Sequence, residues 1–336
     1  MTEGAPTMDA PPRRRLAISG TNAGLGALLV ALIIVFTLVI GENFFSTGVL
    51  RSMMLQMPEL GILSLAMMIT LLAGGLNLAI IATANLCALT MAYVLNRYVP
   101  GSEGFVWGAW QVVAVLAGFV VAAIIGLING YVIAYLNVSP ILATLGTMTM
   151  VKGISVGLTR GNVISGFPEP IVFIANGFVF GVPFSMLVFI ACAIPLAVML
   201  NRTPFGNAIY MLGSNPDATR YSGVRTRRVT MKIYLLSSLL AGVAAVVMMS
   251  RFNSANASYA ESYLLVTILA AVLGGIDPFG GFGKVGGLVL ALIILQVISS
   301  AFNLLGLSQF VTIAIWGALL IATSVFALLY RSRLRA

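Results

Sequence analysis

The chain has 336 residues, of which 60% are hydrophobic and only 8% are charged. A water-soluble fold needs more polar surface than this composition offers, so a soluble globular protein is excluded. The formal net charge is +9, but the basic residues gather near the N-terminus, in 201–232 and at the C-terminus, which is typical of cytoplasmic loops and argues against nucleic-acid binding.

Apolar runs of about 20 residues, the length that a bilayer core of roughly 30 Å requires, recur along the chain, and strand-like alternation is absent. The sequence therefore predicts an all-α polytopic membrane protein with about ten transmembrane helices. The predicted spans are 24–41, 53–73, 78–96, 107–135, 140–158, 183–200, 231–250, 262–275, 285–303 and 308–329. Two regions stay open, because 53–96 could re-enter the membrane instead of crossing it, and 159–182 is polar but could hold a short helix over 171–180.

The predicted organisation is one transmembrane domain, 24–330, between an N-terminal tail, 1–23, and a C-terminal tail, 331–336. Arginines at 13–15 precede the first apolar run and no small-residue cleavage site follows it, so we expect an uncleaved first span. An even number of spans puts both termini on one side. The distribution of Lys and Arg assigns that side, together with the loop 201–232, to the cytoplasm.

Two similar glycine breaks interrupt the two halves of the chain, each with an apolar pair, two glycines, an aliphatic residue and Asn or Asp. They are Gly74-Gly75 before Asn77 and Gly274-Gly275 before Asp277. Matching breaks in two halves indicate related halves and a pathway near the middle of the membrane. The alternative is that these glycines serve helix packing and a tight turn.

The long polar loop contains the pattern of a short helix. Asn215 is a typical N-cap, Pro216 suits the first helical position, and Asp217 faces the positive end of the helix dipole. Gly223 provides a C-terminal stop. A helix of about two turns is too short to be stable alone in water, so we expect it to dock on a partner.

The sequence carries no catalytic or metal-binding constellation. His is absent, Cys87 and Cys192 lie in apolar runs, and no nucleophile elbow or acid pair is present. The stretch 280–284 ends like a phosphate-binding loop, but position 278 is proline and Val285 follows the lysine. We therefore expect no enzyme activity, no metal, no cofactor bound by this chain, and no ATP hydrolysis by it.

Around the short helix, the residues resemble a known family. Asp217-Ala218-Thr219 with Gly223 is similar to the E-A-A-x-x-x-G signature in permease subunits of ATP-binding-cassette importers, and the wider run resembles the ribose-type branch. The further matching positions are Leu71 to Leu78, Pro140 to Gly146, Phe205-Gly206, Tyr210, Gly213, Ser222, Val224, Tyr234, Ala241-Gly242, Leu273, Gly280-Gly281, Gly283 and Asn303 to Gly306. The resemblance covers nearly the whole chain from about residue 24 and is weakly specific for the sugar.

The resemblance implies a permease subunit of the bacterial inner membrane that translocates a monosaccharide or similar small polar solute by alternating access. The implied partners are cytoplasmic ATPase subunits that hold ATP and Mg, a periplasmic solute-binding protein, and a second permease subunit in a homodimer or heterodimer. An autoinducer-type furanone, a nucleoside or an inositol are alternative solutes. An ion-coupled secondary transporter and a membrane-embedded enzyme are rival classes, and both lack supporting residues.

In that family, the short helix is the coupling helix, which sits in a groove on the ATPase. The coupling residues implied here are Asn215, Pro216, Asp217, Ala218, Thr219, Arg220, Ser222 and Gly223. Nearby arginines are explained equally well by the excess of positive charge in cytoplasmic loops.

Polar side chains inside predicted spans are costly and suit a pathway for a neutral polyol. The candidates are Asn77, Asn85, Asn129, Thr144, Thr147, Gln296 and Asn303. Hydrogen bonding between helices is the alternative reading. Glu59 and Lys152 are expected near span ends, with the charged heads reaching the interface.

The chain also departs from the family pattern. Asn77 stands where the family has an acid, and Leu264 and Val266 replace an acid pair. These changes indicate either a subfamily with another solute or one half of a heterodimer.

Overall fold

The computed structural model describes residues 15–333. Its α-helices are α1 (Arg15–Ile40), α2 (Thr47–Leu72), α3 (Ile80–Tyr98), α4 (Gly104–Tyr135), α5 (Pro140–Thr159), α6 (Glu169–Asn176), α7 (Phe184–Arg202), α8 (Pro204–Ser214), α9 (Pro216–Tyr221), α10 (Thr226–Phe252), α11 (Tyr263–Leu273), α12 (Val285–Leu304) and α13 (Gln309–Arg333). A 3-10 helix, η1 (Gly41–Phe45), joins α1 to α2. The predicted tails 1–23 and 331–336 lie partly outside the described residues, and their described parts continue α1 and α13.

The prediction of an all-α polytopic membrane protein is confirmed. Within residues 15–333, eight helices are long and apolar enough to cross a membrane, namely α1, α2, α3, α4, α5, α7, α10 and α12. The backbone of α13 adds 25 helical residues, about 37 Å of helix. Because α2 and α3 have 26 and 19 residues, the region 53–96 contains two helices of crossing length and needs no re-entrant loop.

The predicted span 262–275 is wrong as a full crossing. The helix there, α11, has 11 residues and is about 16 Å long, which is about half of a bilayer core. The residues before it, 253–262, are not part of α11: they hold β4 (Ser254–Ala255) and a series of turns. Gly274 then caps the other end of the helix. The apolar run 262–275 itself has 14 residues, about 21 Å as a helix, so it is too short to cross a bilayer core of roughly 30 Å.

The polar region 159–182 contains the expected short helix, α6, which ends at Asn176, before the predicted end of the helix at 180. A hairpin of β2 (Phe178–Val179) and β3 (Val182–Pro183) follows. In front of α6, β1 (Ile164–Ser165) pairs antiparallel with β4, and Ile164 lies opposite Ala255. This pairing ties together two connections that are far apart in the sequence.

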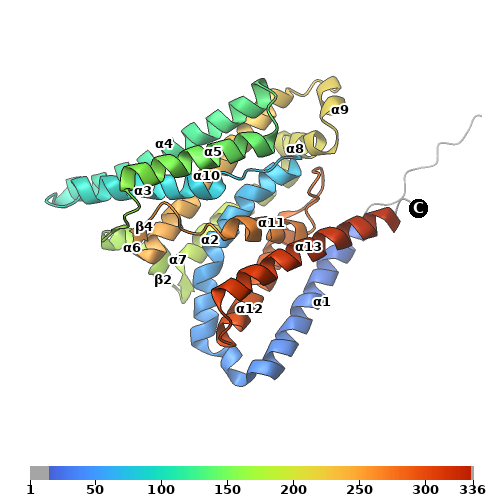
Figure 1. The fold of residues 1–336 in the computed structure, drawn as a ribbon, viewed down its shortest axis with the longest axis horizontal. Helices are drawn as coiled ribbons and strands as arrows, with labels where there is room; N and C mark the ends of the chain where they lie inside the picture. The colour runs from blue at the N-terminus through green and yellow to red at the C-terminus, as the bar shows by residue number, and fades with distance from the viewer. Residues whose placement is uncertain (1–14, 334–336) are drawn as a thin grey trace, which may run out of the picture.

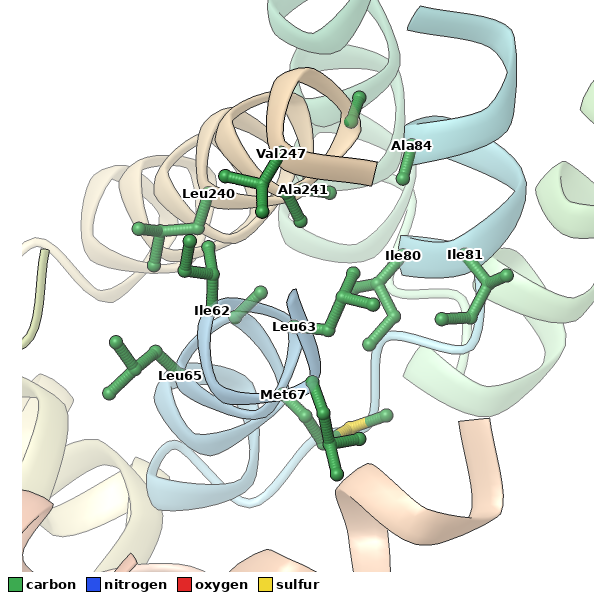
Figure 2. Close-up of a cluster of buried hydrophobic side chains, with 14 of the residues drawn as sticks. Ile62, Leu63, Leu65, Met67, Ile80, Ile81, Ala84, Leu240, Ala241 and Val247 are labelled. Atoms are coloured by element: carbon green, nitrogen blue, oxygen red, sulfur yellow. The ribbon is translucent and has the colours of Figure 1, made fainter. Parts of the chain in front are cut away.

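The core is built around α2. Every residue from Met57 to Leu72 is buried, whereas Leu25 is the one buried residue in the part of α1 from 23 to 40. Figure 2 shows apolar side chains of α2 converging with those of α3 and α10, among them Leu63, Ile80 and Ala241. A central helix that is apolar on all sides is the expected result when neighbouring helices cover its whole circumference.

A close contact joins α4 to α10. Gly126 and Gly130 lie one turn apart on α4, where a Cβ would come within 2.8 Å of the Leu235 Cα and 3.0 Å of the Met231 Cα, respectively. Small residues four apart let two membrane helices approach at backbone distance, and van der Waals packing then stabilises the pair.

Figure 1 shows α3, α4, α5 and α10 side by side in one layer, with α1, α12 and α13 on the other side of α2. The short helices α8 and α9 lie at one end of the molecule, and α6 with the strands lies at the opposite end (Figure 1). The last described turn of α13 reaches the same side as α9. The arginine-rich loop and the described end of the chain therefore share a side.

Candidate functional site

The short helix predicted in the polar loop forms as α9, and its caps follow from local sequence. The Ala218 amide donates to Oδ1 of Asn215 over 3.0 Å, and the Thr219 hydroxyl donates to the Asn215 carbonyl over 2.7 Å. At the other end, the Gly223 amide donates to the Arg220 carbonyl over 3.1 Å. Gly223 has φ +81°, which glycine adopts without strain. The end of α9 is therefore set by a backbone conformation at Gly223 that favours glycine.

One face of α9 is buried and the other is open. Thr219 is buried, whereas Asp217, Ala218 and Arg220 are exposed, and Tyr221 is 91% exposed. A Cβ on Gly223 would meet no atom within 4 Å. Within residues 15–333, nothing covers this outer face, so small residues there leave space for another molecule.

The base of α9 rests on α8, and α8 rests on the glycine breaks. The Gly281 amide donates to the Leu72 carbonyl over 2.9 Å, so the loop that follows the second break touches the end of α2 at the first break. A Cβ on Gly213 of α8 would overlap the Leu72 carbonyl oxygen. The Tyr210 hydroxyl donates to the Gly283 carbonyl over 2.9 Å, and burial raises the pKa of Tyr210, which keeps this donor protonated.

The same type of helix-ending turn occurs at both breaks. The sequence pattern matches Gly74 with Gly274, but the backbone conformation matches Gly74 with Gly275. Gly74 (φ +78°) and Gly275 (φ +80°) are equivalent, because the next amide in each case donates to the carbonyl five residues back, at Thr70 and Ala271. This bond closes a Schellman turn. The first break ends a helix of crossing length and does not interrupt a span, as the tight-turn alternative expects.

The other glycine of each pair, Gly75 or Gly274, serves close packing instead. A Cβ on Gly75 would lie 2.6 Å from the Tyr234 hydroxyl, and one on Gly274 would lie 2.8 Å from the Leu288 Cα in α12. Each break therefore combines one glycine that the backbone conformation requires with one that a neighbouring helix requires.

The first break is also held by two predicted pathway residues. Asn77 donates through Nδ2 to Ser237 Oγ of α10 over 3.0 Å. Thr144 of α5 accepts from the Leu78 amide over 3.1 Å and donates to the Leu76 carbonyl over 3.2 Å. Both side chains are buried, so they join three helices around the turn.

Of the remaining candidates, Thr147 and Asn129 are in contact with each other. Thr147 donates to Asn129 Oδ1 over 2.6 Å, and the buried Asn129 Nδ2 has no partner in the described chain. Asn85 donates to the carbonyls of Ala257 and Tyr259. Gln296 is buried, with its Nε2 3.3 Å from Ser300 Oγ, and Asn303 is exposed at the end of α12. The structure brings Thr147 and Asn129 together and pairs Asn85 and Gln296 with residues outside the candidate set, and the assignment of these residues to a pathway stays a prediction.

One buried charge pair was missed by sequence reasoning. Glu59, expected at a span end, lies inside α2 and is fully buried. Its Oε1 is 2.5 Å from Nη1 of Arg251 and accepts from the Tyr263 hydroxyl over 2.8 Å. Glu59 is the one acid in the sequence between Glu42 and Glu103, and this isolation in an apolar run is the signal that could have found it.

Lys152 behaves differently. It forms an ion pair of 2.7 Å with Glu261, and both side chains are about half exposed. In the described part of the chain, no three His, Cys, Asp or Glu side chains come together as a metal ion would need.

The comparisons with known proteins all find permease components of transport or import systems. Residues 49–324 match the family model described as branched-chain amino acid transport system, permease component. The chain is 30% identical to the ribose import permease protein RbsC of Bacillus subtilis, over 92% of this chain and 94% of that protein. It is 29% identical to the autoinducer 2 import system permease protein LsrD of Yersinia pseudotuberculosis (91% of this chain, 90% of that protein) and of Escherichia coli (91% of each). No solved structure shows a significant match to it.

Proposed function

The chain belongs to the family of branched-chain amino acid transport system permease components, and from this membership we propose how its geometry serves transport. It is a multi-pass protein of the bacterial inner membrane and the permease subunit of an ATP-binding-cassette importer. Its partners, its coupling residues and its solute are the content of the proposal.

The ATPase subunit docks on α9. The observation that carries this assignment is a capped helix whose outer face, from Asp217 to Gly223, is uncovered in residues 15–333. A six-residue helix does not persist by its own hydrogen bonds, so its caps and its seat on α8 hold it ready for a partner. ATP and Mg would be held, and ATP hydrolysed, by that separate cytoplasmic subunit.

Motion of α9 reaches the membrane helices through α8. Gly213 packs against the end of α2, and Tyr210 binds the carbonyl of Gly283 just before α12. Because Gly213 meets the Leu72 backbone directly and the Tyr210 hydroxyl holds the Gly283 carbonyl, a displacement of α8 moves the ends of α2 and α12 together. The glycine turns thus couple the docking helix to the bundle that alternates between its two openings.

The solute is a monosaccharide or a similar small polar molecule, delivered by a periplasmic binding protein and passed between two permease subunits. The relatives named for ribose and for autoinducer 2 support this class, and they leave an autoinducer-type furanone as the alternative. The candidate pathway groups are neutral amides and hydroxyls, which bind hydroxyl groups without the cost of burying a charge.

The test is to replace Gly223 by leucine in the full chain and to measure binding of the ATPase subunit and vanadate-sensitive uptake. Open space surrounds Gly223, so the variant folds with a strain of about 1–2 kcal/mol. We expect binding to the ATPase to weaken by about tenfold, equivalent to roughly 1.4 kcal/mol, and uptake to fall with it.

The matched control is Gly181→Leu, in the turn between β2 and β3. Gly181 has φ +80° and the same open surroundings, but it lies at the opposite end of the molecule. The control carries the same backbone strain and should keep both ATPase binding and uptake. Normal ATPase binding by Gly223→Leu, or equal losses in both variants, would reject the assignment. Uptake that depends on an ion gradient and is insensitive to vanadate would support the rival class of secondary transporters.

A further inference from the structure

A cavity of about 550 Å³ opens between the end of α4, α9 and the start of α10. Its polar wall carries four arginines, which are Arg220, Arg225, Arg227 and Arg228. None of the described residues that line it is acidic, and no ion pair in the described part of the chain includes these arginines. Four arginines therefore line one space that has no acidic residue among its described lining residues.

The backbone adds to this positive potential. Arg225 is the N-cap of α10, Arg227 and Arg228 lie in its first turn, and that turn contains no acid. The N-terminus of a helix is its positive end, where acidic side chains are normally preferred. Cations placed there repel the helix dipole, and a bound anion would relieve the repulsion by both the arginines and the dipole.

The cavity lies at the end of an exposed apolar stripe on α4. Residues three and four positions apart form this stripe, which consists of Val120, Ile124, Leu127, Ile128, Tyr131 and Tyr135. The rings of Tyr131 and Tyr135 stack at 5.3 Å, and the Arg227 guanidinium lies 5.6 Å above the Tyr135 ring. Tyrosine is typical of the depth at which lipid headgroups meet the hydrocarbon core.

We propose that this cavity binds the phosphate headgroup of an anionic phospholipid of the cytoplasmic leaflet, whose acyl chains lie along the α4 stripe. The excess of positive charge in cytoplasmic loops explains why arginines occur on this side, but it does not explain their convergence on one cavity at the foot of an apolar stripe. Basic cavities next to membrane helices on the cytoplasmic side have the chemistry that holds acidic lipid headgroups. The cavity shares Pro216 and Arg220 with α9, so the test changes arginines of α10, which lie outside the coupling residues.

The test uses the full-length chain, purified in detergent and stripped of lipid, and titrates it with phosphatidylglycerol in mixed micelles. Phosphatidylcholine is the zwitterionic comparison, and inorganic phosphate is the probe for a free-anion site. We expect phosphatidylglycerol to bind at least about tenfold more tightly than phosphatidylcholine, and R227Q/R228Q to weaken its binding by about fivefold per arginine.

The control is R202Q/K232Q, which removes the same charge from basic residues that do not line the cavity. It should change the affinity by less than about twofold. Arg225→Gln is the second variant if the double variant does not purify. Unchanged phosphatidylglycerol binding in the cavity variants would overturn the proposal, and so would displacement of the lipid by inorganic phosphate. It would also be overturned if these variants lost only the binding of a protein partner.

Discussion

Glu59 Oε1 lies 2.5 Å from Arg251 Nη1 although 192 residues separate the two in the sequence. The pair joins the middle of α2 to the end of α10, and the Tyr263 hydroxyl attaches the start of α11 to the same oxygen. Since Glu59 is fully buried, its charge depends on this partner for compensation. The pair therefore fixes where the short helix α11 begins against the central helix.

Removing one partner of this pair should cost far more than removing a surface pair. We expect Arg251→Met to lower the free energy of unfolding by about 3–5 kcal/mol, because it leaves a buried carboxylate uncompensated. Lys152→Met breaks the half-exposed pair with Glu261 and should cost less than about 1 kcal/mol. Unfolding of the purified protein in detergent measures both.

The double variant Glu59→Leu with Arg251→Met completes this experiment. It removes both charges and should recover most of the loss, because the uncompensated charge is then absent. If Arg251→Met lowers the free energy of unfolding no more than Lys152→Met does, the pair of Glu59 and Arg251 does not hold α2 against α10 as its geometry indicates.

The contact between α8 and the glycine turns should be intolerant of a single methyl group. A Cβ on Gly213 would overlap the Leu72 carbonyl oxygen, and backbone atoms on both sides cannot rotate away. We expect Gly213→Ala to destabilise the protein by about 1–3 kcal/mol and to increase hydrogen exchange in α8 and α9. Gly146→Ala in α5, where a Cβ meets nothing within 4 Å, is the control and should be neutral. Equal behaviour of the two variants would contradict the role given to Gly213.

The N-cap of α9 should matter for docking more than for folding. Asn215→Ala removes the acceptor of the Ala218 amide, at a cost of about 1 kcal/mol, and α9 has too few residues to absorb the loss. We expect faster hydrogen exchange over 216–221 and weaker ATPase binding, with little change in Tm. Asn215→Asp keeps a carboxyl oxygen at the cap and should behave like the unmodified protein. Full ATPase binding by Asn215→Ala would show that the preformed helix is not needed.

The features that depend on neighbours in the chain were predictable from the sequence. Apolar runs of bilayer length predict α1, α2, α3, α4, α5, α7, α10 and α12, because a helix satisfies its own backbone in lipid. Helices α1, α2 and α10 begin nine, six and five residues before the predicted spans, and the other ends agree within three residues. The caps of α9 were equally readable, since Asn215 and Gly223 act on atoms within four residues of themselves. The resemblance to importer permeases rests on the same local stretch.

Tertiary structure alone decided the features that join distant segments. The sequence predicts a span at 262–275, but the helix there ends at Leu273, and contacts with Asn85 and the pairing of β1 with β4 fix the turns that precede it. The two glycine breaks look like separate interruptions in the sequence, yet the Gly281 amide, in the loop after the second break, donates to the Leu72 carbonyl beside the first. The partner of Glu59 and the convergence of arginines on one cavity are likewise non-local. Hydropathy and capping patterns reflect the free energy of each residue within its own helix. The contacts between distant segments depend instead on which helices pack against one another.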